Sequence, residues 1–139
     1  MSTDSAATVK TTEQVPGPRW VPWPFAIAMT VTAGMVFLQS VFAGGLIAES
    51  VASEDAHRLN GMSLTLAFLI VLVTSVFVRW PGRGPIWPLV SSGVFILLVM
   101  VQAVLGFAEL VEFHVPLGVL ITIGAVLNAV RAWKLVRRP

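Results

Sequence analysis

Two histidines in matching surroundings are the residues of this chain best suited to chemistry. His57 is followed four residues later by Gly61, and His114 is followed four residues later by Gly118. Residues four apart on a helix share one face, so each imidazole would lie beside a position without a side chain. An imidazole binds a metal through one ring nitrogen, and a glycine lets a flat group approach the helix backbone. The pattern predicts two imidazoles that face each other across a flat, metal-containing cofactor.

Long apolar runs must position these histidines. The 139-residue chain is 56% hydrophobic and 12% charged. Crossing roughly 30 Å of hydrocarbon takes about 20 apolar residues in a helix. Four runs reach that length: about Phe25–Ile47, Ala56–Val78, Ile86–Ala108 and Val115–Ala132. We therefore expect an all-α, polytopic membrane four-helix bundle over residues 23–134, with a disordered cytoplasmic tail at 1–22 and a basic cytoplasmic tail at 135–139.

Charged residues predict how these helices cross the membrane. All the basic residues except Arg58 lie in three segments: Lys10 and Arg19 before the first run, Arg79 and Arg83 between the second and third, and Arg131, Lys134, Arg137 and Arg138 at the end. The other two connections carry Glu49, Glu54 and Asp55, and Glu109 and Glu112. Lys and Arg concentrate on the cytoplasmic side, so we expect a multi-pass protein of the cytoplasmic membrane with both termini inside. Both histidines would then lie at the outer side, within about one turn of their helix starts.

Aromatic and basic residues of the inner side have an ordinary explanation. The five tryptophans, Trp20, Trp23, Trp80, Trp87 and Trp133, all fall on the basic side and suit an interfacial aromatic belt. The pI near 9.9 comes from basic residues spread over membrane ends. We therefore expect the lipid bilayer as a partner, and no nucleic acid.

The two halves of the chain also resemble each other. Residues 39–43, Gln-Ser-Val-Phe-Ala, align with residues 102–106, Gln-Ala-Val-Leu-Gly, and each stretch leads through an acidic connection to a His-x-x-x-Gly sequence. The match predicts two helical hairpins in an internal repeat, related by a pseudo-two-fold axis along the membrane normal. Such an axis would bring His57 and His114 into facing positions.

Haem fits these ligands better than other metal groups. A structural zinc site takes about four ligands from the protein, whereas haem takes two axial ones, and the sequence offers two histidines and no cysteine. Met35, Met62 and Met100 are alternative axial ligands, although packing is the common use of methionine in helices. In the simpler alternative, each histidine caps its own helix in the headgroup region.

Several polar residues near the histidines have two interpretations. Arg58 would pair with a haem propionate or with a nearby carboxylate, either Glu54 or Asp55. Gln39 and Gln102 would either join helices by hydrogen bonds or lie beside the cofactor. Asn60 would bond a propionate or a loop carbonyl.

The stretch Glu54-Asp55-Ala56-His57-Arg58, followed two helices later by His114-Val115-Pro116-Leu117-Gly118, resembles one four-helix half of a haem A synthase. The resemblance extends over about Val36 to Val130. The chain is also similar to small four-helix membrane proteins of actinobacteria, which share the paired glutamines and the His-x-x-x-Gly pattern. The resemblance to haem A synthase implies axial ligation by His57 and His114. Because that family uses a Glu-x-x-His motif near its substrate haem, the resemblance also implies a catalytic carboxylate at Glu54.

Two departures from the family weaken the case for catalysis. The chain has one half rather than two, and it has no counterpart of the outer-loop cysteine pair that many haem A synthases carry. The leading hypothesis is therefore a b-type haem protein for electron transfer or haem handling, with a redox partner or a second copy of the chain as partner. The alternatives are a haem-modifying oxidoreductase and a cofactor-free accessory membrane subunit.

Overall fold

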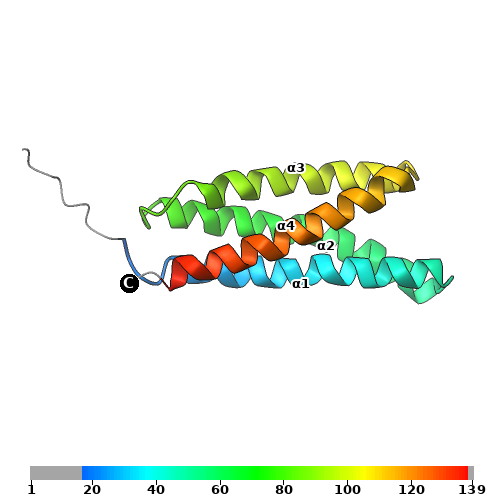
Figure 1. Ribbon diagram of the computed structural model, residues 1–139, viewed down its shortest axis with the longest axis horizontal. Coiled ribbons are helices and arrows are strands. Elements are labelled where there is room, and N and C mark those ends of the chain that lie inside the picture. The colour runs from blue at the N-terminus through cyan, green and yellow to red at the C-terminus, as the bar shows by residue number, and fades with distance from the viewer. Residues whose placement is uncertain (1–16, 138–139) are drawn as a thin grey trace, which may run out of the picture.

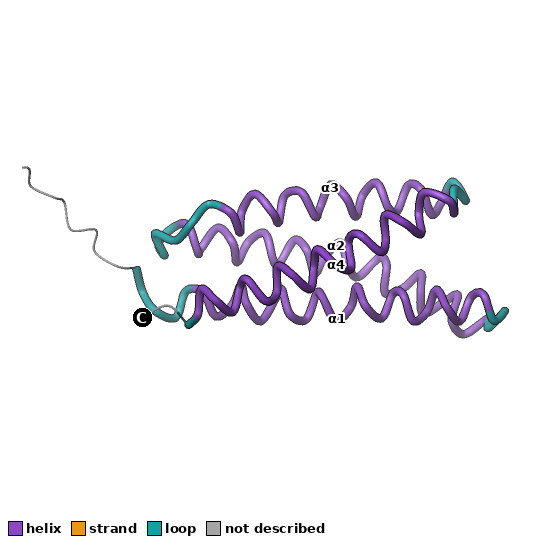
Figure 2. The backbone as a smooth tube through the Cα atoms, viewed as in Figure 1, coloured by secondary structure: helices purple, strands orange, loops and turns teal. Residues whose placement is uncertain are grey.

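The protein consists of four long helices in an antiparallel arrangement (Figures 1 and 2). The computed structural model describes residues 17–137. The helices are α1 (Pro22–Ile47), α2 (Val51–Arg79), α3 (Trp87–Phe107) and α4 (Val111–Val136). All four are long and apolar enough to cross a membrane. The all-α class and the four long apolar helices expected from the sequence are therefore confirmed; the predictions for residues 1–16 and 138–139 lie outside the described part of the chain.

The two helices that carry histidine begin earlier than their apolar runs do. α2 starts at Val51 and includes Glu54 in its first turn, and α4 starts at Val111 and includes Glu112. Carboxylates in a first turn interact favourably with the positive end of the helix dipole, so a helix can extend past the apolar residues. His114 lies about one turn inside α4, as expected. His57 lies almost two turns inside α2, so the expectation of one turn was wrong for it.

Each helix contacts two neighbours, in the cyclic order α1, α2, α3, α4. Within the described residues, the backbones of α1 and α3 make no close contact, and neither do those of α2 and α4. α2 and α4 are therefore diagonal partners that run in the same direction. At the end where the α1–α2 and α3–α4 turns lie, the two hairpin tips are apart in the view of Figure 1.

The hydrophobic core fills only part of the bundle's length. Counting toward the end with the two hairpin tips, the last buried side chains are Val36 on α1, Leu64 on α2, Val99 on α3 and Ile121 on α4. Beyond these residues, roughly 12 to 20 Å of each helix carries no buried side chain within the described chain, at 1.5 Å per residue. Both histidines lie in this loosely packed end.

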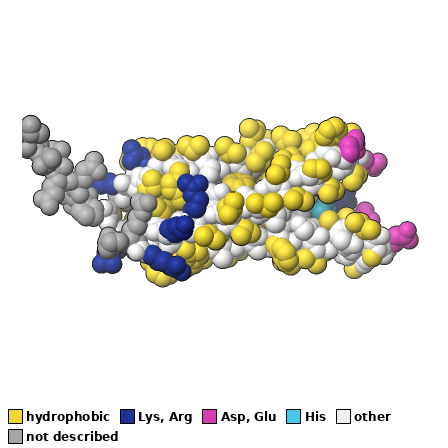
Figure 3. Space-filling view, viewed as in Figure 1, with side chains coloured by type: hydrophobic (Ala, Val, Ile, Leu, Met, Phe, Trp, Pro, Cys, Tyr) yellow, Lys and Arg dark blue, Asp and Glu magenta, His cyan; other side chains and the backbone are white. Residues whose placement is uncertain are grey.

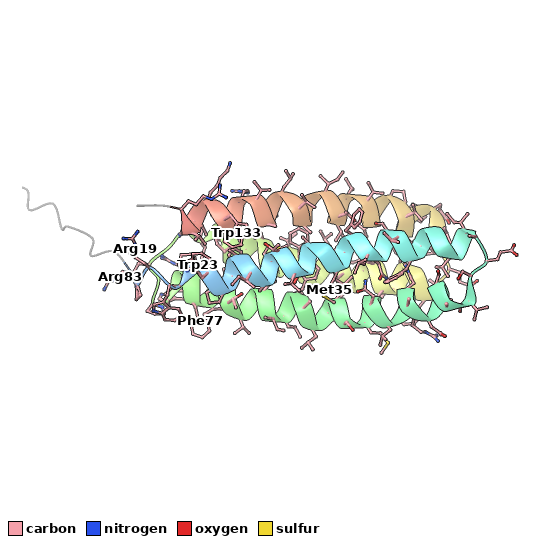
Figure 4. All side chains as sticks on the ribbon, turned by 90° about the horizontal axis from the view of Figure 1, so that it is seen from below. Arg19, Trp23, Met35, Phe77, Arg83 and Trp133 are labelled. Atoms are coloured by element: carbon pink, nitrogen blue, oxygen red, sulfur yellow. The ribbon has the colours of Figure 1, made fainter. Side chains whose placement is uncertain are left out.

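The opposite end is packed and rich in aromatic contacts. Trp23 and Trp133 lie near each other (Figure 4) and meet edge to face with their ring centres 5.6 Å apart. The indole of Trp133 donates a hydrogen bond of 2.9 Å to the Thr30 hydroxyl. The guanidinium of Arg131 lies 4.5 Å from the ring centre of Trp87. Lys and Arg gather at this end, and Asp and Glu gather at the hairpin tips (Figure 3). The molecule therefore has a basic end and an acidic end, and the histidines belong to the acidic end.

Candidate functional site

Gln39 on α1 and His57 on α2 exchange two hydrogen bonds. The side-chain amide of Gln39 donates from Nε2 to the main-chain oxygen of His57 at 2.9 Å. The Nδ1 atom of His57 lies 3.3 Å from the main-chain oxygen of Gln39. A carbonyl oxygen can only accept, so Nδ1 carries the proton in this contact. In the neutral imidazole, the other ring nitrogen, Nε2, then has the lone pair.

The same exchange joins Gln102 on α3 and His114 on α4. Nε2 of Gln102 donates to the main-chain oxygen of His114 at 2.7 Å, and Nδ1 of His114 lies 3.0 Å from the main-chain oxygen of Gln102. For the same reason Nδ1 is the donor and Nε2 has a lone pair. Each hairpin of the fold thus fixes one imidazole in one tautomer.

The two imidazoles meet across the interior of the bundle. Their ring centres are 6.2 Å apart and their planes are inclined at 52°. α2 and α4 make no close backbone contact, so the two rings span the gap between diagonal helices. Both side chains are half-buried, and Figure 3 shows a histidine in a recess between the acidic tips. The two histidines predicted to face each other are close together.

The glycines that come after the histidines accommodate glutamine side chains. A Cβ on Gly61 would lie 2.9 Å from Nε2 of Gln39, and a Cβ on Gly118 would lie 3.0 Å from Nε2 of Gln102. The space beside each histidine is therefore taken by an amide of the neighbouring helix, and not left for a flat group as the sequence suggested. In each hairpin, therefore, the glycine provides the space that the glutamine amide occupies when it bonds to the histidine main chain.

Asn60 extends the network in the first hairpin only. Its amide nitrogen lies 2.9 Å from the main-chain oxygen of Met35 and 2.6 Å from Oε1 of Gln39. It bonds α1 and not a loop carbonyl, which corrects one of the two expectations from the sequence. Leu117 has the corresponding position after His114, and Oε1 of Gln102 is buried without a hydrogen-bond partner among the described residues. The two halves of the site therefore differ in polarity.

The other candidates lie outside this network. Arg58 and Glu54 are exposed, and within residues 17–137 the side chain of neither makes a hydrogen bond or ion pair, so the expected pairing of Arg58 with Glu54 or Asp55 is not present. Met62 and Met100 are exposed. The described chain also contains no group of three or more His, Asp or Glu side chains able to hold a metal ion.

Apolar grooves elsewhere on the bundle do not reach the histidines. One lies between α1 and α2 and is lined by residues such as Ile27, Val31, Leu66 and Ile70. Another lies between α2 and α3. Both are open depressions on the apolar outer surface, as expected where two neighbouring helices of a membrane bundle face lipid.

Comparisons with protein-family models, curated proteins and solved structures found no significant match to this chain. The function must therefore be inferred from the geometry of the site itself. That geometry offers two imidazoles close together, each with Nδ1 held by a main-chain oxygen, in the loosely packed end of an apolar bundle.

Proposed function

We propose that this chain is an integral membrane b-type haem protein in which His57 and His114 are the two axial ligands of the iron. The observation that carries the proposal is the separation of the rings. Two metal–imidazole bonds of about 2 Å, plus about 1 Å from each nitrogen to its ring centre, put the centres of two axial imidazoles about 6 Å apart. The ring centres of His57 and His114 are 6.2 Å apart.

The hydrogen bonds of the imidazoles support the same function. Histidines that bind metals almost always donate their other ring N–H to a carbonyl or carboxylate, which fixes the tautomer and raises the basicity of the ligating nitrogen. Here the acceptors are the main-chain oxygens of Gln39 and Gln102. With Nδ1 as the donor, Nε2 of each ring is the nitrogen that would ligate the iron.

Packing of the bundle provides a place for a large flat group. The acidic end has no buried side chain beyond Val36, Leu64, Val99 and Ile121 in the described chain, whereas the basic end is closely packed. A loosely packed end costs a membrane bundle stability, because the dispersion contacts between its helices are lost there. A porphyrin between the diagonal helices α2 and α4 would restore those contacts. Haem supplies one-electron chemistry, and two protein ligands suit electron transfer or haem handling rather than oxygen binding.

The charge distribution supports an orientation. Basic residues at one end and acidic residues at the other agree with both termini in the cytoplasm and the histidines near the outer face of the cytoplasmic membrane. Arg58 is the basic residue at the acidic end, it is exposed, and it directly follows His57. Its guanidinium has the chemistry to bind a haem propionate through a charge-assisted hydrogen bond.

Burial along the helices supports a tandem repeat of two hairpins. The buried residues Leu64, Phe68, Ser75 and Val78 of α2 recur as Ile121, Ala125, Ala132 and Leu135 of α4, at the interval that separates His57 from His114. Phe25, Met29, Thr32 and Val36 of α1 likewise recur as Pro88, Ser92, Phe95 and Val99 of α3, at the interval between Gln39 and Gln102. The turns also agree, since Glu49 and Glu109 have φ values of 55° and 58°.

Absorption spectroscopy of the purified full chain tests the proposal. Protein from haem-replete cells should show the reduced-minus-oxidised bands of a low-spin, six-coordinate haem. His57→Ala and His114→Ala should each abolish that six-coordinate spectrum, and Met100→Leu, which removes an exposed methionine, should leave it unchanged. A folded, colourless wild-type protein would overturn the proposal.

One observation favours a rival function, that of a cofactor-free accessory subunit. The Gln–His exchanges join helices within each hairpin, and they need no metal to do so. In that case both histidine variants would lose thermal stability and no haem would be present in any sample. No comparable observation favours catalysis by Glu54, because that side chain is exposed and outside the network.

A further inference from the structure

Gly106 on α3 lies directly against the imidazole of His114. A Cβ at this position would be 3.1 Å from Cε1 and 3.2 Å from Nδ1 of that ring. Contacts this short force a neighbour to move by a few tenths of an ångström, and the neighbour here is a ring whose Nδ1 donates a hydrogen bond. A side chain at position 106 would therefore act on the hydrogen bond of His114.

Ala43 occupies the corresponding position in the first hairpin. It follows Gln39 by four residues on α1, as Gly106 follows Gln102 by four residues on α3, and it is half-buried. The distance from Nδ1 to the glutamine carbonyl is 3.3 Å for His57, in the hairpin that has Ala43, and 3.0 Å for His114, which lies against Gly106. The longer bond occurs in the hairpin that carries the extra methyl group.

We propose that Ala43 and Gly106 are positioning residues that make the two axial ligands inequivalent, by setting how closely each Nδ1 approaches its carbonyl oxygen. This inference rests on the proposed haem function. It assigns His114 as the stronger ligand and His57 as the weaker one. Asn60 and Leu117 do not explain the difference between the two Nδ1–oxygen distances. Asn60 donates to the side-chain oxygen of Gln39, whereas His57 donates to the main-chain oxygen of Gln39.

The difference acts on the iron through the electron density of the ligating nitrogen. A shorter Nδ1–H···O bond gives the ring more imidazolate character and makes Nε2 a better donor. A better donor stabilises ferric over ferrous haem, because the ferric ion carries the greater charge. The midpoint potential should therefore fall as either bond shortens and rise as either bond lengthens.

Two single substitutions and their combination test the inference on the haem-loaded, full-length protein. Gly106→Ala should displace the His114 ring and raise the midpoint potential in a spectroelectrochemical titration. Ala43→Gly should let His57 approach its carbonyl and lower the potential. The double variant, which exchanges the two residues between hairpins, should return the potential toward that of the wild type.

Matched controls separate this effect from the general consequence of changing glycine or alanine in a helix. Gly93→Ala adds a methyl group where nothing lies within 4 Å, and Ala103→Gly removes one from an exposed position on the same helix. Both should leave the potential unchanged. If Gly106→Ala fails to hold haem, Ala43→Gly still tests the inference, because it only removes a methyl group.

The outcomes also separate this inference from the proposed function. Haem bound in every variant, with a potential equal to that of the wild type in both Ala43→Gly and Gly106→Ala, would overturn the inference alone. Haem missing from the wild-type protein itself would overturn the proposed function.

Discussion

Gln102 and His114 bind each other twice, with the glutamine amide 2.7 Å from the histidine main-chain oxygen and the histidine Nδ1 3.0 Å from the glutamine main-chain oxygen. One partner is a side chain and the other a main chain in each bond, so the exchange fixes both the rotation of α4 against α3 and the tautomer of the imidazole. Gln39 and His57 repeat the arrangement. A glutamine on each hairpin is therefore the residue that orients a histidine on the next helix.

Substitution of the glutamines should affect the two hairpins unequally. Gln39→Leu removes a donor to His57 and an acceptor for Asn60, whereas Gln102→Leu removes a donor to His114 together with a buried oxygen that has no described partner. Interhelical hydrogen bonds in membrane proteins are worth about 0.6 kcal/mol on average and up to about 1.7 kcal/mol. We expect Gln39→Leu to destabilise the protein by about 1 kcal/mol more than Gln102→Leu. Thermal unfolding in detergent measures this difference, and equal losses would contradict it.

The glycines after the histidines should not tolerate a methyl group. Gly61→Ala and Gly118→Ala place a Cβ about 3 Å from the glutamine amides that bind the histidine main chains. We expect a loss of about 1–3 kcal/mol in stability and a reduced haem content, because overpacking displaces the amide or separates the helices. Gly34→Ala is the matched control, since nothing lies within 4 Å of its added Cβ. Retention of wild-type haem content and stability in both site variants would show that the glutamines do not need this space.

Asn60 should stabilise the first hairpin without being required for haem. Asn60→Leu gives the first hairpin the residue that the second has at Leu117 and removes bonds to Met35 and Gln39. We expect a loss of about 1 kcal/mol in thermal stability, with the haem spectrum retained. Because the main-chain oxygen that accepts from His57 is untouched, a large change in haem spectrum would indicate that Asn60 itself contacts the cofactor.

The sequence predicted the number of helices, their approximate spans and the proximity of the two histidines. It did not predict that Gly61 would receive the amide of Gln39, or that Asn60 would bond the Met35 carbonyl. These contacts depend on the rotation of each helix about its axis. In a soluble helix the polar face reveals that rotation, but a membrane helix is apolar on both its lipid-facing and its core-facing sides. Gly106 was missed for the same reason, since small residues in such helices usually serve close packing.

Chemical rescue tests axial ligation more directly than loss of colour does. His57→Gly removes the ring while the helix, its partner Gln39 and the second ligand His114 remain, and it leaves a space the size of an imidazole in a part of the bundle that is loosely packed. If His57 binds iron, millimolar imidazole added to haem-loaded His57→Gly should restore the low-spin, six-coordinate spectrum. His114→Gly should respond in the same way. Addition of a similar concentration of 2-methylimidazole is the control, because its methyl group hinders six-coordination. A spectrum that imidazole leaves unchanged in both variants would mean that the histidines orient helices but do not hold the iron.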